Sequence, residues 1–449
     1  MGVIPGRTDD DGPAPGRTPD RTRSDRPHWI VTTVLVLAAA ACYFGIVAVR
    51  LGPPSGGDTV PLTSVTSALA DGDLHAAASA ASLPNPPGYP LLAAPFVAAF
   101  PSTVGSAAWC TPNGRIHPSR AGGATTEVPA GVVPCDGPSG AGADVLPPWY
   151  RSQGLLGVLS WLVLALGALI LLRAARADTV GRQAGLVVFL AFLPAASSAI
   201  VQLYHPQDIV SLGLALAGLA QVLRRRWLLA GVLFGLAVLT KQFAVLLLLP
   251  ALVAAPGWRA RTTTAGSAVV VFLAGILPFF VVDPRATLEN LSGFSAGGAA
   301  AGQTVLSLAG VHGTVASAVA RDAPVLFALV VCVWAARRPD VHAERAVTLV
   351  ALALVCTGSR LVFESVVFPY YLLAASVLVF LLDLVARRSP HWSLAWCAAA
   401  AFFVAVHPGN RIVAAVGTLV LAVVVVGIGF AELLPGERRR VGAEVAGAR

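Results

Sequence analysis

Charged residues are scarce in this chain of 449 residues: they make up 12% of it, whereas hydrophobic residues make up 56%. A soluble globular protein has about 25% charged residues, so this composition does not suit a surface that faces water. The chain instead carries long runs of Leu, Val and Ala. Each long run approaches the ~20 residues that cross a bilayer as a helix. The sequence therefore predicts an all-α fold, a polytopic transmembrane helical bundle.

Nucleotide-binding motifs are missing as well. No Gly-x-Gly-x-x-Gly or Walker-type sequence occurs, and the expected cytoplasmic loops are too short for a βαβ unit, which takes ~30 residues. The net charge of +8 could indicate nucleic acid, but basic stripes with interleaved aromatic residues are absent, which excludes that partner. No Cys/His spacing indicates zinc, and we expect neither a metal nor a cofactor.

The arginines lie in short clusters between the apolar runs, as the positive-inside rule requires of cytoplasmic loops. Placing these clusters inside gives about twelve spans with both termini in the cytoplasm of a cell-membrane protein. The predicted parts are a cytoplasmic tail over residues 1–28, a transmembrane domain over 29–434 and a second tail over 435–449. The first loop, residues 50–150, is the longest and lies on the external face.

Two apolar stretches do not fit a full span, and a pair of acids indicates a turn. Pro90–Ala108 reads as an interfacial or re-entrant helix, because a span there would invert the arginine clusters. Asp71 and Asp73 indicate a turn between two interfacial helices. Trp227–Ala255 has arginines at both ends, so we predict a hairpin with Lys241 at its tip. Arms of ~14 residues reach ~21 Å, less than the ~30 Å hydrocarbon core, which puts Lys241 below the external surface in a polar cavity.

Lys241 and Asp58 are the first candidates for chemistry. Lys241 is the only lysine in the chain, and a lysine at membrane depth is costly without a partner. Its ammonium suits a phosphate oxygen, although a lysine snorkelling to the interface is an alternative. Asp58 lies just beyond the first expected span, where a carboxylate can deprotonate a hydroxyl or be an ordinary loop acid.

Two further pairs of residues lie at external helix ends. His205 and Asp208 occur in Tyr-His-Pro-Gln-Asp, where Pro206 suits the first turn of a helix and Asp208 favours its dipole. Helix capping thus competes with function, although it does not explain the histidine. Arg360 and Glu364 are spaced four residues apart, which fits either an ion pair on one helix face or a carboxylate that directs Arg360 toward an anionic ligand.

The cysteines divide into two groups. Cys110 and Cys135 both fall in the long external loop, where a disulfide would close a loop of about 25 residues and stabilise the fold by roughly 3 kcal/mol. The others lie in apolar runs and are expected to be packing residues. They are Cys42, Cys332, Cys356 and Cys397.

These features together resemble the GT-C superfamily of membrane glycosyltransferases. Within it the chain is most similar to the polyprenyl-phosphate-mannose-dependent mannosyltransferases of bacterial envelopes, glycosyltransferase family 87. The resemblance rests on Asp58 after the first span, on the interfacial helix pair and on four short stretches. These are Gly72-Asp73-Leu74-His75, Pro86-Pro87-Gly88-Tyr89-Pro90, His205-Pro206-Gln207-Asp208 and the hairpin from Gly231 to Lys241.

The resemblance implies an inverting transfer of a sugar from a polyprenyl-phosphate donor to a lipid or glycan acceptor on the external face. Asp58 would deprotonate the acceptor hydroxyl, and Lys241 with Arg360 or His205 would stabilise the departing phosphate. The expected substrate-binding residues are Tyr89, His205, Asp208, Lys241, Arg360 and Glu364. Mannose is the sugar that the family implies, while arabinose or glucose would fit the same residues.

Two other classes of protein remain open. A secondary transporter or a flippase for lipid-linked sugars would also have about twelve spans and buried charges. The absence of a two-fold internal repeat and the long first loop speak against it. A non-catalytic scaffold would leave Lys241 and Asp58 without a role.

Overall fold

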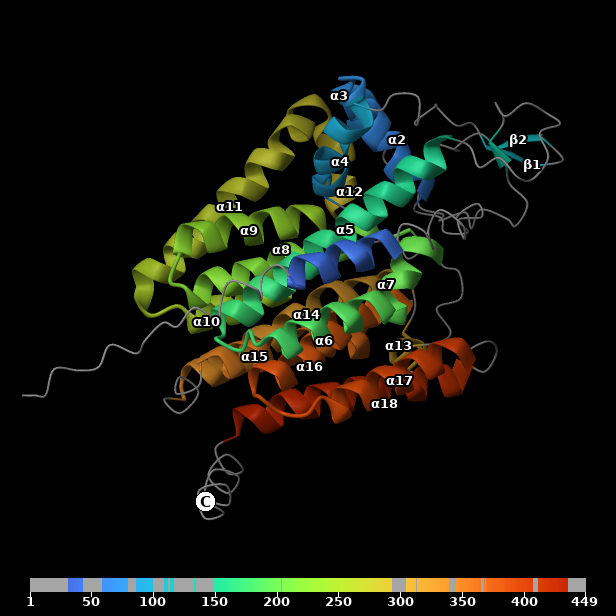
Figure 1. Ribbon diagram of the computed structural model, residues 1–449. Helices are drawn as coiled ribbons and strands as arrows, with labels where there is room; N and C mark the ends of the chain where they lie inside the picture. The colour runs from blue at the N-terminus through green and yellow to red at the C-terminus, as the bar shows by residue number, and fades with distance from the viewer. Residues whose placement is uncertain are drawn as a thin grey trace, which may run out of the picture.

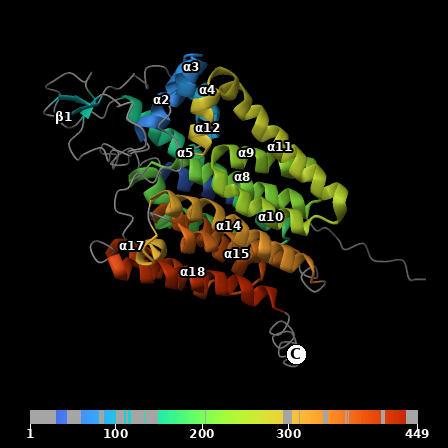
Figure 2. The same cartoon turned by 180° about the vertical axis from the view of Figure 1, so that it is seen from behind.

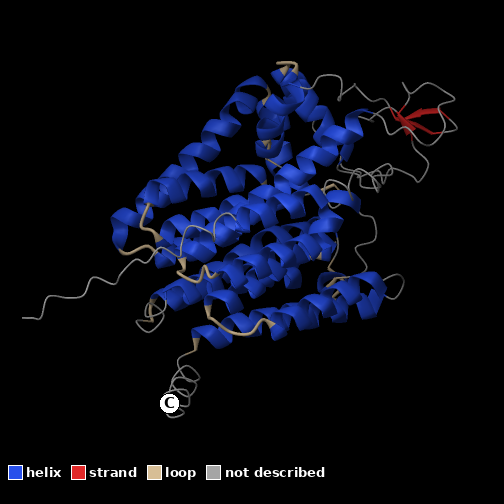
Figure 3. Cartoon of the chain, viewed as in Figure 1, coloured by secondary structure: helices blue, strands red, loops and turns tan. Residues whose placement is uncertain are grey.

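The computed structural model describes residues 31–42, 59–79, 86–99, 109–111, 114–116, 133–134, 148–202, 204–292, 304–311, 313–338, 345–364, 367, 369–406 and 411–434. These residues are almost entirely helical (Figures 1 and 3). Helices satisfy every backbone hydrogen bond within one segment, which suits a chain whose side chains are mostly apolar. The predicted helical class is confirmed.

Six helices in the described part are long and apolar enough to cross a membrane. They are α5 (Pro148–Ala174), α8 (Pro206–Leu223), α11 (Gly257–Val282), α14 (Gly313–Ala336), α15 (Arg345–Phe363) and α18 (Arg411–Leu433). A bent pair, Val180–Phe192 with Pro194–Ile200, turns by 48° and gives up to seven. The first member of this pair is α6, and α7 (Pro194–Ser197) begins the second. The expected count of about twelve spans is thus not confirmed.

Five shorter apolar helices of the described part accompany these six. They are Val31–Cys42, α4 (Gly88–Ala99), α9 (Trp227–Thr240), Gln242–Ala254 and α16 (Leu372–Val385). The helix α17 (His391–Val406) packs between α16 and α18, and α13 (Val305–Leu308) is a single turn. A helix of 12 residues is only about 18 Å long, which is too short to cross the ~30 Å hydrocarbon core of a bilayer. The helix α4 has 12 residues and is too short for a span by itself, while the rest of the stretch predicted to be interfacial or re-entrant, residues 100–108, lies outside the described residues.

A close approach of two backbones joins α5 to α8 in the core. A Cβ atom built on Gly167 would lie 2.1 Å from the carbonyl oxygen of Gly213. No side chain larger than hydrogen fits there without moving one of the helices. Small residues allow this kind of contact in membrane bundles, where packing rather than water exclusion holds helices together. This close contact between Gly167 and Gly213 fixes α8 against α5, and α8 carries the polar residues described below.

The hairpin predicted around Lys241 is present. The helix α9 ends at Thr240, Lys241 is extended with φ −156° and ψ 129°, and a short 3₁₀ turn, η3 (Gln242–Ala244), leads into α10 (Val245–Ala254). The helix α9 packs along both α8 and α11. Lys241 therefore lies at a break in the helix, at the tip of the hairpin.

Four short helices gather at one end of the bundle, as both views show (Figures 1 and 2). They are α2 (Thr59–Ala70), α3 (Leu74–Ser79), α4 and α12 (Pro284–Ser292). The turn predicted between α2 and α3 is confirmed: Gly72 has φ +77°, and the Asp73 carboxylate accepts a hydrogen bond of 2.8 Å from the Ala76 amide. We call α2, α3 and α4 the cap unit.

A small antiparallel sheet interrupts the helical pattern, and the sequence did not predict it. Its strands are β1 (Trp109–Thr111), β2 (Gly114–Ile116) and β3 (Val133–Pro134), in the order β2-β1-β3. Strands of two or three residues carry too little alternation to be recognised from a sequence. Cys110 pairs with Val133 in this sheet, but Cys135 and the predicted disulfide lie outside the described residues.

The remaining cysteines divide by position. Cys332 and Cys356 are buried with their sulfurs 3.9 Å apart, and Cys397 is buried too, as expected for packing residues. Cys42 is exposed on the described surface, which corrects the expectation that it packs inside. Both predicted tails and most of the predicted external loop lie outside the described residues, so the domain boundaries stay predictions.

Candidate active site

The N-terminus of α8 carries the first part of the site. His205 is the N-cap residue, Pro206 takes the first helical position and Asp208 lies in the first turn. Proline suits that position because its missing N–H is not needed there, and an acid favours the positive end of the helix dipole. The His205 side chain makes no capping hydrogen bond. Capping thus explains the place of the aspartate but not that of the histidine.

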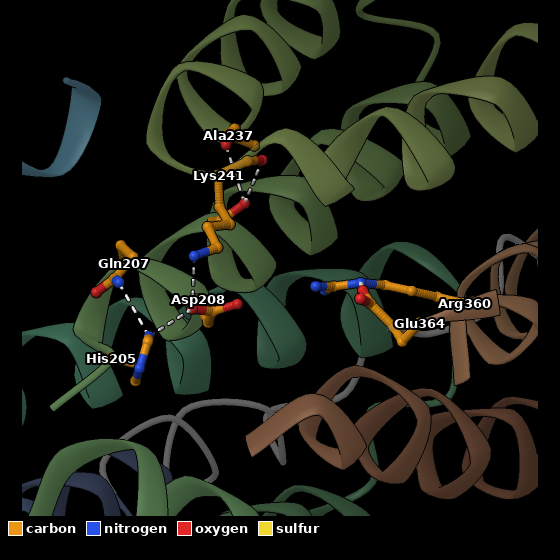
Figure 4. A network of polar contacts seen from close by, with 8 residues as sticks. His205, Gln207, Asp208, Ala237, Lys241, Arg360 and Glu364 are labelled. Atoms are coloured by element: carbon orange, nitrogen blue, oxygen red, sulfur yellow. Dashed lines mark hydrogen bonds and ion pairs between the residues drawn. The ribbon is translucent and has the colours of Figure 1, made fainter. Parts of the chain in front are cut away.

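The Asp208 carboxylate lies between a lysine and a histidine (Figure 4). Its Oδ2 is 3.6 Å from Lys241 Nζ and 3.5 Å from His205 Nδ1. The Asp208 and His205 side chains are buried, and that of Lys241 is 14% exposed. Lys241 is therefore held by a buried carboxylate rather than directed to the surface of the described structure, which argues against simple snorkelling.

Neighbouring backbone and side-chain contacts hold Lys241 in this place. Ser211, one turn beyond Asp208 on α8, donates a hydrogen bond of 2.9 Å to the Ala237 carbonyl and lies 3.4 Å from the Lys241 carbonyl. Gln242 donates through Nε2 to the Leu291 carbonyl of α12 at 3.1 Å. These hydrogen bonds hold the break between α9 and α10 against α8 on one side and against α12 on the other.

Arg360 and Glu364 form an ion pair at the end of α15. Glu364 lies just after the helix, which ends at Phe363, and its side chain is buried. The Arg360 guanidinium lies 4.3 Å from the centre of the Tyr371 ring and 5.4 Å from that of Phe243. In Figure 4 it extends from α15 toward Asp208 and Lys241. The ion pair and the ligand-directing interpretations are therefore compatible in this geometry.

Aromatic rings connect the two halves of the site. Tyr370 stacks on the His205 ring with centroids 3.9 Å apart, and it meets Tyr371 edge to face at 4.7 Å. Both tyrosines belong to η5 (Pro369–Tyr371). The stacked rings are more than 160 residues apart in the sequence, so this contact could not be predicted. The run Pro-Tyr-Tyr after Arg360 was the only feature of the sequence that marked these tyrosines.

Gln207 adds a contact that the sequence did not predict. Its Nε2 lies 3.1 Å from His205 Nδ1, the same nitrogen that faces Asp208. One ring nitrogen cannot both accept from the amide and donate to the carboxylate, so the tautomer of His205 decides which contact is made. With the proton on Nδ1, the ring donates to Asp208 and holds that carboxylate in place.

Five residues thus form one mostly buried assembly, which we call the charge cluster. They are His205, Asp208, Lys241, Arg360 and Glu364. Its two cations and two carboxylates are balanced, since each cation has an acid against it. In the described chain no group of three His, Cys, Asp or Glu residues is arranged to hold a metal ion.

The remaining predicted residues lie elsewhere. The Tyr89 hydroxyl is 3.2 Å from that of Tyr204, and both side chains are buried. Burial raises the pKa of both phenols, so each stays protonated and able to donate. Tyr89 therefore contacts the residue before His205 rather than the charge cluster itself. Asp58 lies outside the described residues and directly precedes Thr59, the first residue of α2.

Comparison with known proteins gives one match. The family model of glycosyltransferase family 87 matches residues 145–365, nearly half of the chain and all five residues of the charge cluster. No curated protein and no solved structure matches. The match supports a membrane glycosyltransferase of the GT-C type, and it indicates that the chain is an enzyme. Such an enzyme requires a sugar donor and an acceptor.

Proposed function

We propose that this glycosyltransferase, as the family match identifies it, takes its sugar from a polyprenyl-phosphate donor. The sugar would pass with inversion to a lipid or glycan acceptor of the cell envelope. The observation that carries the proposal is the charge cluster, in which Lys241 and Arg360 lie against buried carboxylates. Burying such charges costs several kcal/mol per ion before pairing, so their retention favours a functional role.

The chemistry of the donor explains why two cations suit this site. A sugar phosphodiester carries one negative charge, and breaking the bond between the anomeric carbon and the phosphate oxygen leaves a monoester with a second one. The electron pair of that bond stays on the phosphate. Cations placed beside this oxygen stabilise the transition state more than the bound donor, which is the condition for catalysis.

The two carboxylates have a different task in this proposal. Without donor, Asp208 holds Lys241, and Glu364 holds Arg360. When the donor binds, its phosphate becomes a further partner for both cations, while the carboxylates keep the ammonium and the guanidinium oriented. His205 is a third candidate contact for the phosphate, and its ring is fixed by Tyr370.

Asp58 remains the proposed base. It would accept the proton of the acceptor hydroxyl as that oxygen attacks the anomeric carbon opposite the leaving phosphate. The position of Asp58 in the chain supports this role, because it directly precedes α2 and the cap unit packs against α9 beside Lys241. No second acid occurs close to it in the sequence.

The side of the membrane and the sugar belong to the same proposal. The cap unit and the charge cluster would face the external side of the cell membrane, with about twelve spans and both termini in the cytoplasm. The arginine clusters support this orientation. The family resemblance favours mannose as the sugar.

A transfer assay tests the proposal. Purified protein in lipid receives a radiolabelled polyprenyl-phosphate sugar and envelope lipid extract, and both labelled product and free polyprenyl phosphate are measured. Asp58→Asn is expected to lower the rate at least about 100-fold, since a general base contributes 10²–10⁴-fold. Asp71→Asn is the matched control, because Asp71 lies exposed in the turn after α2.

Either of two results would overturn the proposal. Wild-type protein that makes no product with mannose, arabinose or glucose donors would remove the reaction itself. Uptake of the labelled donor into vesicles without transfer would point to a transporter or flippase. Normal transfer by Asp58→Asn would remove only the role of that residue.

A further inference from the structure

Tyr89 links the cap unit to the segment that enters α8. Its hydroxyl is 3.2 Å from that of Tyr204, and the two rings are packed among buried residues of α2, α4 and α8 such as Leu62, Val97 and Val210. Tyr204 directly precedes His205 and has φ +50°. A tyrosine in this left-handed conformation costs roughly 1 kcal/mol or more and persists only where its surroundings hold it. The contact with Tyr89 is part of what holds it.

Gly88 makes a second contact, with the end of α9 that leads to Lys241. A Cβ atom on Gly88 would lie 2.4 Å from the Leu239 carbonyl oxygen and 2.6 Å from the Thr240 nitrogen. These atoms belong to the end of α9, directly before Lys241. The first turn of α4 therefore rests on backbone, which cannot swing aside as a side chain can. Only glycine allows this approach.

Two neighbouring residues thus contact two of the three chain segments that carry the charge cluster. Tyr89 contacts the residue before His205, and Gly88 contacts the two residues before Lys241. The same helix packs along α2, which begins one residue after Asp58. A short path of contacts therefore runs from α2 through α4 to the segments that precede His205 and Lys241.

We propose that Gly88 and Tyr89 are positioning residues, which fix the start of α2 relative to the charge cluster and so align the acceptor with the donor. This inference rests on the proposed function. Neither residue needs to touch a substrate for it. A displacement of about 1 Å between reacting groups can cost about 100-fold in rate, and a Cβ atom 2.4 Å from a carbonyl oxygen forces a shift of that order.

The test compares Tyr89→Phe, Tyr204→Phe, their double variant and Gly88→Ala in the transfer assay. Tyr89→Phe keeps the ring and removes only the hydrogen bond. We expect kcat to fall at least about 10-fold, because alignment is lost, while KM for the donor stays within about twofold, because Lys241 and Arg360 are unchanged. The double variant should fall no further than the single ones, since both remove one contact. Gly185→Ala is the control, because a Cβ atom there meets nothing within 4 Å.

The outcomes separate the inference from the proposed function. Inactive wild type contradicts the proposed function and this role with it. Active wild type together with wild-type kcat in both tyrosine variants overturns the inference alone. Kinetic constants that change together with the midpoint of thermal unfolding would show a structural role only, which also overturns it. If Gly88→Ala does not fold, the two tyrosine variants decide.

Discussion

At the scale of single residues, burial separates two ion pairs that look alike in the sequence. Arg360–Glu364 and Arg321–Asp322 each join an arginine to an acid close along the chain. The side chains of the first pair are 16% and 4% exposed, and those of the second 49% and 56%. An exposed pair contributes at most about 1 kcal/mol, whereas removing one partner of a buried pair leaves an uncompensated charge. Replacing the acid by its amide should therefore lower the stability of the fold much more in the first pair than in the second.

Glu364→Gln is expected to destabilise the fold by about 3 kcal/mol, because it leaves the Arg360 guanidinium buried without its acid. Asp322→Asn, the matched control, should lower stability by less than about 1 kcal/mol. The midpoint of thermal unfolding in the same lipid measures both. Equal and small shifts would mean that Arg360 is not held by Glu364 in the folded protein.

At the scale of helices, the local order of the site could be predicted from the sequence, but its assembly could not. Pro206 and Asp208 marked the start of α8, and the arginines on either side of the hairpin put Lys241 at its tip; the structure has both features. The pairing of Asp208 with Lys241 follows from the packing of α8 on α9, a contact between helices that periodicity does not specify.

The other contacts in the site that the sequence could not predict also join segments far apart in the chain. The stacking of Tyr370 on His205 and the approach of Gly88 to Leu239 each join elements far apart in the chain. Tyr89 was expected to bind substrate because its motif resembles that of a family. In the structure its hydroxyl lies 3.2 Å from that of Tyr204, a contact that the motif does not indicate. A motif shows which residues matter, while only packing shows what they contact.

The seam between α5 and α8 gives a prediction at this scale. Gly167→Ala puts a methyl group where 2.1 Å separates the Cβ position from the Gly213 carbonyl oxygen. The helices must move apart, and overpacking of this kind costs about 1–3 kcal/mol. Gly181→Ala should be neutral or slightly stabilising, because its Cβ position is open and alanine favours a helix. Thermal unfolding of the two variants in lipid compares them, and equal midpoints would contradict the close packing of α5 on α8.

At the scale of the whole molecule, the exposed apolar surface shows where lipid must lie. The helix α11 is only 17% buried over its most apolar window, and Val270 and Val281 are 65% and 72% exposed. At 1.5 Å per residue, its 26 residues extend about 39 Å, more than the ~30 Å hydrocarbon core. Exposure of this kind over a full span is compatible with lipid but not with water.

The ends of α11 test the orientation of the molecule. Arg259 lies near its start and Arg285 just beyond its end, and both are exposed. A cysteine replacing Arg285 should react with a membrane-impermeant maleimide in intact cells, whereas one replacing Arg259 should react only after permeabilisation. The unsubstituted protein is the control for maleimide labelling of the native cysteines. The reverse pattern would invert the topology and move the proposed site to the cytoplasmic face.

The most direct test of the central claim is the dependence of sugar transfer on Lys241. Transfer from a polyprenyl-phosphate sugar is measured for wild type, for Lys241→Ala and for Arg321→Ala, which removes an exposed cation that is paired with Asp322 outside the charge cluster. If Lys241 stabilises the departing phosphate, Lys241→Ala lowers kcat about 100-fold or more, and Arg321→Ala behaves like wild type. A folded Lys241→Ala variant that transfers sugar at the wild-type rate would contradict the account.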